Sequence, residues 1–231
     1  MARPYGRKIR RQVKKILEDP DRFKALDRLT QIPDPQLKAH LFFFLYNQDE
    51  LIRFRSVTAM GHLGFRMAET HMEKARDLMR RILWNLNDES GGIGWGSAEA
   101  MGEILSRHPG LAGEFDSIMF SFLDPEANFI DNPQLQQGIL WGMGTYAKAA
   151  PDRITPYRAS VIVPFLDDEA SMKKAYAIRA LNHAGRLDPD TRPEHLLSDQ
   201  TEILMYTGWT FKTTRICDLV RETAGRQRNI R

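Results

Sequence analysis

A pattern of about forty residues recurs four times along the chain. When the four segments are superposed, Ala59, Ala100, Leu140 and Ala180 share one column, at spacings of 41, 40 and 40 residues. Each segment has an apolar stretch, an acidic turn and a second stretch rich in alanine and glycine. Two helical stretches per unit at this period are typical of helical repeat arrays. We therefore predict an all-α fold, an α-solenoid of about five helical hairpins.

The composition of each unit explains how such an array would pack. An aspartate in the acidic turn can cap the following helix by accepting hydrogen bonds from its free backbone N–H groups. Glycine inside a helix costs about 1 kcal/mol relative to alanine. Its recurrence at positions such as Gly61, Gly102 and Gly142 therefore indicates close contact between neighbouring helices. No useful length of sequence alternates with period two, so we expect no β-sheet.

Two segments resemble a known repeat. The stretch from Leu45 to Gly64, which includes Asp49-Glu-Leu-Ile-Arg-Phe-Arg and Ala59-Met-Gly-His-Leu-Gly, resembles the HEAT-like repeat of the phycobilisome-lyase type, and so does the stretch from Phe165 to Gly185. The resemblance covers about residues 35–190. Glu89-Ser-Gly-Gly-Ile-Gly-Trp-Gly is similar to an uncharacterised group of bacterial HEAT-repeat proteins. This resemblance implies a solenoid that serves mostly as a scaffold or binding surface.

The domain organisation follows from the repeat. We expect residues 1–231 to form one solenoid domain, with a basic N-terminal helix in residues 1–18, repeats over about 35–190, and capping helices in 191–231. The N-terminal helix is amphipathic, because Ile9, Val13, Ile16 and Leu17 fall on one stripe.

Charge is distributed unevenly. The whole chain carries +3, whereas residues 1–18 carry +6 and residues 203–231 carry +4, which leaves −7 for the part between them. Lysine and arginine at the two ends can meet phosphates or an acidic protein, or they can be solvated tails that aid solubility. The candidate contacts are Arg7, Lys8, Arg10, Arg11, Lys14, Lys212 and Arg215.

Breaks in the repeat suggest a second set of candidates. Insertions at residues 90–97 and 127–134 lie between the two helices of their units, so we expect them to be neighbours. The first is rich in glycine and runs into a helix N-terminus, where free N–H groups can hold an anion. The candidate ligand or partner residues are Gly92, Gly94, Trp95, Glu99, Glu103, Asp131, Asn132 and Trp141.

The four tryptophans and the pair Glu99 and Glu103 also have structural interpretations. Trp95 can line a pocket or fill the gap between two units. Trp141 shares its column with Met60, Met101 and Leu181, which favours a core position. Trp84 is expected in the core. Trp209 can stack on a base or a partner side chain, or pack on the last repeat. Glu99 and Glu103 share a helix face and can be a solvated pair.

Several classes of function are disfavoured. The longest apolar stretch, Leu41 to Tyr46, is far shorter than the roughly 18–20 residues of a membrane span. The six histidines and single cysteine show no metal-ligand spacing, so we expect neither a metal nor a cofactor. Cys217 is expected to be a buried structural thiol. No secretory signal is seen, and we expect a cytoplasmic protein.

The leading hypothesis is a non-enzymatic interaction protein. It would bind a partner protein or peptide on the concave face, lined by the second helices, and on the inserted loops. The alternative is nucleic-acid binding or repair, of the HEAT-like DNA glycosylase type, through the basic ends and a Trp/Glu pocket. A third class, a small enzyme acting on a pigment or cofactor, rests on the lyase resemblance alone. The oligomeric state is left open.

Overall fold

A computed structural model describes residues 4–87, 94–187 and 193–227 of the chain. Within these ranges the chain forms eleven α-helices, three short 3₁₀ helices and one two-stranded β-hairpin. Most helices form consecutive pairs that match the predicted repeat. The pairs are α1 (Pro4–Leu17) with α2 (Arg22–Thr30), α3 (Asp34–Leu45) with α4 (Glu50–Thr70), α5 (Met72–Leu86) with α6 (Ser97–Leu105), α7 (Pro109–Ser121) with α8 (Pro133–Ala149), and α9 (Pro156–Ser160) with α10 (Ser171–His183).

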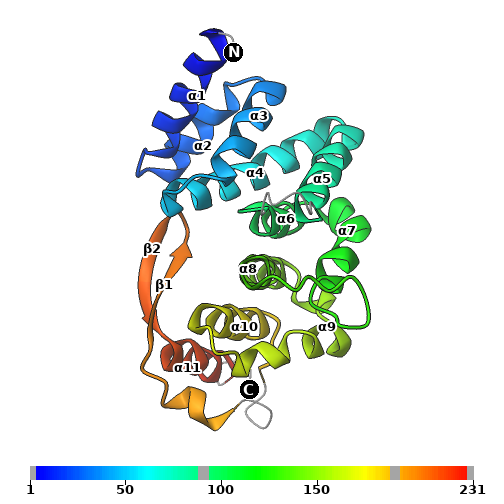
Figure 1. Cartoon of the computed structure of the whole chain (residues 1–231), viewed down its shortest axis with the longest axis vertical. Coiled ribbons are helices and arrows are strands. Elements are labelled where there is room, and N and C mark those ends of the chain that lie inside the picture. Colours follow the sequence, from blue (N-terminus) through cyan, green and yellow to red (C-terminus); the bar gives the residue numbers. More distant parts are fainter. Residues whose placement is uncertain (1–3, 88–93, 188–192, 228–231) are drawn as a thin grey trace.

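The second helices of the last four pairs stack on one another along the inner side of an arc. Helix α4 packs on α6, α6 on α8, and α8 on α10, while α5, α7 and α9 lie on the outer side (Figure 1). The last unit is atypical, because α9 is a short helix followed by the 3₁₀ turn Val163–Asp167. This translational stacking is an α-solenoid, and the predicted fold class is confirmed.

Local sequence sets where these helices begin. Asp49 caps α4, its carboxylate accepting hydrogen bonds from the N–H groups of Leu51 and Ile52 at 2.9 and 3.3 Å. Asn132 caps α8 by accepting from the Leu135 N–H at 3.1 Å. Each cap satisfies donors that have no partner inside the helix. The acidic turn thus caps the first unit as predicted, whereas an asparagine takes this role in the third.

Glycine sets the spacing of the inner helices. A Cβ atom built on Gly102 of α6 would lie 2.3 Å from the Cα of Gly142 on α8. Real side chains never approach backbone this closely, so the two helices can meet here only because both positions lack a side chain. The close contact predicted from the repeat column is confirmed.

The N-terminal helix packs as its sequence pattern indicates. Ile9, Val13, Ile16 and Leu17 are all buried and join the continuous hydrophobic core. Cys217 is a buried free thiol, as expected. Trp84 was expected in the core, but its side chain is 73% exposed on α5. The neighbours Leu83 and Leu86 carry the packing of that helix end instead.

The C-terminal part is not the set of helices that the sequence led us to expect. Strands β1 (Glu202–Thr207) and β2 (Thr210–Arg215) form an antiparallel hairpin, in register from the pair Glu202 and Arg215 to the pair Thr207 and Thr210. The helix α11 (Ile216–Gln227) follows. In β2 only Phe211 and Thr214 are half-buried and the other four residues are exposed, so the strand has no apolar alternation to reveal it. The expectation that the chain has no sheet was therefore wrong here.

The hairpin reaches back from the last repeat to the first. Trp209, at its tip, is buried, and its indole Nε1 donates to the Asp19 carbonyl at 2.8 Å. Arg55 of α4 donates from Nε to the Trp209 carbonyl at 3.0 Å and from Nη1 to the Leu17 carbonyl at 2.7 Å. In Figure 1 the hairpin spans the open side of the arc from α11 to the α2–α4 end. Trp209 therefore packs on the first units, and neither on a ligand nor on the last repeat.

An aromatic cluster holds the middle of the hairpin against the inner helices. Tyr206 of β1 stacks on Phe54 of α4 with ring centroids 5.0 Å apart, and Phe211 of β2 meets Phe54 edge-on at 5.6 Å. Trp141 of α8 contacts the same Phe54 ring at 5.3 Å. Such ring pairs contribute about 0.5–1.5 kcal/mol each beyond the area that they bury. Over the described ranges, no helix has both the length and the apolar character needed to cross a membrane.

Candidate functional site

A cavity of about 750 Å³ lies between the inner helices and the hairpin. Its wall is formed by the second helices α4, α6, α8 and α10, by both strands, by one residue of α2 and by two of α11. The second helices therefore line the concave side, as predicted, but the chain's own hairpin covers much of that side. The volume falls within the range of about 300–1,000 Å³ that encloses a small ligand or a few side chains.

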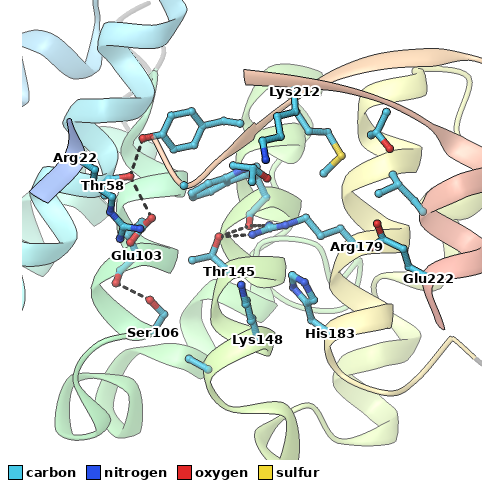
Figure 2. Close-up of a pocket in the computed structure, with 18 of the residues that line it drawn as sticks. Arg22, Thr58, Glu103, Ser106, Thr145, Lys148, Arg179, His183, Lys212 and Glu222 are labelled. Carbon is cyan, nitrogen blue, oxygen red and sulfur yellow. Dashed lines mark hydrogen bonds between the residues drawn. The ribbon is translucent and has the colours of Figure 1, made fainter. Parts of the chain in front are cut away.

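The cavity wall is strongly basic. Among the described residues that line it, five are arginine or lysine and two are glutamate; they are Arg22, Arg107, Lys148, Arg179 and Lys212, with Glu103 and Glu222. Figure 2 shows Lys212 projecting from the hairpin on one side and Lys148 from α8 on the other, with Arg179 between them. Because the charges converge from separate elements on one enclosed volume, the wall favours an anion.

Glu103 is held in fixed contacts within this wall. Its carboxylate accepts hydrogen bonds from Arg107 at 2.6 Å and from the Thr58 hydroxyl at 3.3 Å. The Thr58 hydroxyl in turn lies 3.1 Å from the Tyr206 hydroxyl, which joins α4 to the hairpin (Figure 2). Glu103 thus neutralises the charge of Arg107 and fixes the side chains of Arg107 and Thr58 in the cavity wall. Such an arrangement is suited to holding a ligand rather than to moving a proton.

Arg179 lies over the ring of Trp141 and is positioned by α8. Its Nη1 donates to the Trp141 carbonyl at 2.9 Å and its Nη2 to the Thr145 hydroxyl at 3.0 Å. Its guanidinium carbon lies 5.2 Å from the Trp141 ring centroid, within the range of a cation–π contact. Burial lowers the pKa of Arg179 to about 10, although the nearby Tyr176 and Glu103 raise it. An anion beside Arg179 would offset this loss of hydration.

Two buried donors in the wall have no hydrogen-bond acceptor within the described structure. Trp141 is 2% exposed, and its indole Nε1 is without a partner. The Nε of Arg22 on α2 is also buried and without a partner. Nearly all buried polar groups in proteins are hydrogen-bonded, so these two donors are exceptions, and a ligand would reach either one only if neighbouring side chains moved. The adjacent His62 has its pKa lowered to about 4, first by burial and then by the charges of Arg107 and Arg22.

The structure brings only part of the predicted site together. Of the residues taken from the repeat breaks and the basic ends, Glu103, Trp141 and Lys212 line the cavity. Trp95 and Glu99 do not. Trp95 is 38% exposed with the Arg53 guanidinium 5.7 Å from its ring centroid. Glu99 lies against Gly138 of α8, and burial raises the pKa of its carboxyl despite the charge of Arg53.

The other loop residues have structural positions. Gly92 lies outside the described residues, as do the other residues of 90–93, so the proximity of the two insertions stays a prediction. A Cβ on Gly94 would lie 2.5 Å from the Asn85 carbonyl oxygen, which accounts for a glycine at that point. Asn132 serves as the cap of α8, and Asp131 beside it is exposed.

The basic residues at the two ends do not form one surface. Arg7, Arg10, Arg11 and Lys14 line a separate groove on α1, while Lys8 is exposed on the same helix outside that lining. Lys212 lies in the cavity. Arg215, at the end of β2, donates to Gln200 at 2.9 Å and pairs with Asp218 at 3.7 Å.

Four of the five cations in the cavity were missed by sequence reasoning. Arg22, Arg107, Lys148 and Arg179 come from helices that are distant in the chain, and only the closed arc brings them together. One sequence signal could have found one of them. Arg179 lies within Ala175-Tyr-Ala-Ile-Arg-Ala-Leu, a run of α10 whose other residues are small or apolar. A charged residue there faces the concave side or disrupts the stack.

Comparisons with known proteins assign no activity to the chain. No family model matches the chain. It is similar to an uncharacterized protein of Archaeoglobus fulgidus, with 28% identity over 188 residues, which are 80% of this chain and 93% of that protein. The stacking of the inner helices and the contacts of the hairpin make the chain a helical-repeat solenoid whose concave side is covered by its own C-terminal hairpin.

Among solved structures, the chain resembles designed armadillo repeat proteins. One, designed for modular peptide recognition, has a TM-score of 0.49 and 15% identity, and the match covers 94% of this chain and 98% of the other. A second has a TM-score of 0.46 and 14% identity, covering 93% and 98% of the two chains. Likenesses at this level carry no argument about what this chain binds.

Proposed function

We propose that this protein is a non-enzymatic binding protein that holds an acidic segment of a partner protein in the cavity between α4, α6, α8, α10 and the hairpin. The observation that carries the proposal is the excess of positive charge on an enclosed wall, with five arginine or lysine residues and two glutamates. The Arg179 guanidinium, held over the Trp141 ring by the Trp141 carbonyl and the Thr145 hydroxyl, adds a fixed cation for a carboxylate.

A protein segment suits the site because the wall combines charge with apolar surface. Trp141, Met205 and Leu219 line the cavity together with the cations. Buried aromatic residues and arginine are the residue types that dominate binding energy at protein interfaces. The rim lysines Lys148 and Lys212 are exposed and would act mainly on the rate of association.

We also propose the repeat type, the extent of the domain and the cellular location of the protein. We place the chain among HEAT-like repeat proteins of the phycobilisome-lyase type, on the resemblance of the repeats at 45–64 and 165–185. We treat residues 1–231 as one functional unit, because the hairpin links the last helices to the first. A cytoplasmic location remains part of the same proposal.

The direct test is binding of a fluorescein-labelled oligoglutamate peptide, followed by fluorescence anisotropy. We expect Lys148→Glu and Lys212→Glu each to weaken binding by about tenfold, equivalent to about 1.4 kcal/mol. The matched control is Lys74→Glu, which makes the same charge change on an exposed lysine of the outer helix α5 and should leave the affinity unchanged.

Two outcomes would contradict the proposal. Equal losses in Lys74→Glu and Lys148→Glu would mean that only overall charge matters. Tight binding of inorganic tripolyphosphate, with none of oligoglutamate, would mean that the cavity serves a small anion and not a protein segment.

A further inference from the structure

A second groove lies on the N-terminal helix, separate from the cavity. It has a volume of about 310 Å³ and is lined by Arg7, Arg10, Arg11 and Lys14 of α1 and by Phe43, Phe44 and Asn47 at the end of α3. None of these residues lines the cavity between the inner helices and the hairpin. We call this set of residues the α1 groove.

The charge of α1 is of one sign. Its described length holds six arginine or lysine residues and no aspartate or glutamate. The four that line the groove are spaced at i, i+3, i+4 and i+7, so they share one face of the helix. They extend over about 10 Å, which matches about three successive phosphates at the rise of a stacked strand. The helix itself carries no carboxylate, and although Glu18 just beyond its end pairs with Lys14 at 3.0 Å, both side chains are exposed and the row keeps a net positive charge suited to a polyanion.

An exposed aromatic ring distinguishes this groove from a simple basic surface. Phe43 is 46% exposed, although it lies in the apolar run that forms the core side of α3. The guanidinium of Arg10 lies over its ring, 4.0 Å from the centroid. The Nε of Arg10 is buried and has no hydrogen-bond partner within the described structure. Arg10 is therefore held flat against the Phe43 ring.

A flat guanidinium supported by an aromatic ring is a stacking surface. Unpaired bases stack on aromatic rings and on arginine planes, while lysine and arginine beside them hold the phosphates. Neither an acidic peptide nor an anionic membrane makes use of such a plane. We infer that the α1 groove binds single-stranded nucleic acid, with Arg10 and Phe43 stacking a base and Arg7, Arg11 and Lys14 contacting the phosphates.

The test uses the full chain and a fluorescein-labelled oligodeoxythymidine of about 15 nucleotides, a length chosen to exceed one such groove. We expect binding that weakens with salt, with a slope of log K against log salt of about −2, as three phosphate contacts to a single strand require. Phe43→Leu should weaken binding by about 5- to 150-fold, the range measured for loss of one base stack, and should leave the slope unchanged.

Matched controls separate the groove from the rest of the molecule. Phe65→Leu removes another exposed ring, 41% accessible on α4, and should have no effect on binding. Lys148→Glu alters the cavity and should also have no effect, so that this inference and the proposed function can fail independently. Arg11→Gln should reduce the steepness of the salt dependence by about 0.7, one phosphate contact.

Three results would overturn the inference. Phe43→Leu could bind as well as the unmodified chain, which would remove the stacking role. Duplex DNA or oligoglutamate of equal charge could bind as tightly as the single strand, which would make the groove a general polyanion surface. Vesicles containing anionic lipid could bind while the oligonucleotide does not, which would make it a membrane-facing surface.

Discussion

Gly102 and Gly142 show how single residues fix the distance between two inner helices. A Cβ on Gly102 would overlap the backbone of Gly142 at 2.3 Å, so any side chain there must push α6 from α8. We predict that Gly102→Ala lowers the free energy of unfolding by about 1–3 kcal/mol, the usual cost of overpacking. Urea unfolding followed by circular dichroism measures this difference.

The matched control is another helical glycine. Gly113 of α7 is exposed, and a Cβ there would meet nothing within 4 Å. Gly113→Ala should therefore stabilise the protein by about 0.4–1 kcal/mol, because alanine restricts the unfolded chain and fits the helix. Equal effects of the two substitutions would show that the α6–α8 contact is looser than described.

Asp116 predicts how stability depends on pH. Burial of this carboxyl raises its pKa, but hydrogen bonds from Arg158, Arg153 and Tyr146 outweigh burial and lower the pKa to about 2. A depressed pKa in the folded state stabilises the protein above the ordinary aspartate pKa, and this contribution is lost as pH falls from about 4 to 2. Its size is about 2 kcal/mol.

Unfolding by urea at a series of pH values tests this role. Asp116→Asn should be less stable at neutral pH and should lose less stability on acidification than the unmodified chain. Asp152→Asn, which changes an exposed carboxylate nearby, is the control and should follow the unmodified chain. An unchanged acid profile in Asp116→Asn would contradict the assignment.

The burial of two tryptophans shows what can and cannot be predicted from the sequence. Trp141 was predicted in the core from its repeat column, and it is 2% exposed. Trp84 was expected in the core only because it lies on the first helix of the second unit, whereas its side chain is 73% exposed. A repeat column reports a shared environment, while an apolar neighbourhood on one helix does not say which residue faces outward.

Among the elements, the inner helices were predictable and the hairpin was not. The small residues of α6 and α8 belong to a pattern that recurs in each unit, so the same helix contact can be predicted at each repeat. The hairpin is held instead by contacts across most of the sequence, such as Arg55 with the Trp209 carbonyl. No local pattern in the hairpin sequence indicates a contact with a residue about 150 positions earlier in the chain.

The same contrast applies to the candidate site. Glu103 and Trp141 were found because they lie on repeat helices, and Lys212 because it lies in a basic end. Arg22 comes from a helix outside the repeat alignment, and it reaches the cavity only through the closure of the arc. Sequence therefore predicts the helices that carry a site more readily than the set of side chains that converge on it.

Trp209 is the anchor of the hairpin, and its loss should release that element. Its indole donates to Asp19, and its backbone has a positive φ of 140°, a strained value held by the contact with Arg55. We predict that Trp209→Ala speeds amide hydrogen exchange in residues 202–215, while exchange in α6 and α8 is unchanged. Hydrogen exchange with mass spectrometry reads both regions in one experiment.

The control for this prediction is Leu204→Ala, which removes a side chain that is 51% exposed on β1. It should leave exchange in the hairpin close to that of the unmodified chain. If hairpin amides exchange as slowly in Trp209→Ala as in Leu204→Ala, the prediction is wrong. The aromatic cluster around Phe54, and not the tip, would then hold the strands in place.

At the scale of the whole molecule, the hairpin converts an open arc into a partly covered cavity. An open solenoid offers a long surface, whereas this chain covers its concave side and leaves a cavity of about 750 Å³ with a basic wall (Figures 1 and 2). The α1 groove lies outside this enclosure. A partner's acidic segment and a nucleic acid strand could therefore occupy the molecule together.

The central claim is that an acidic ligand enters this cavity and reaches Trp141. The most direct measurement is a two-dimensional NMR titration of the ¹⁵N-labelled protein with oligoglutamate, following the indole N–H signals. Because the Trp141 side chain contributes to the cavity wall, we predict that its indole N–H signal shifts on binding, while that of exposed Trp84 stays in place. Movement of the Trp84 or Trp95 signal, with Trp141 unchanged, would contradict the account.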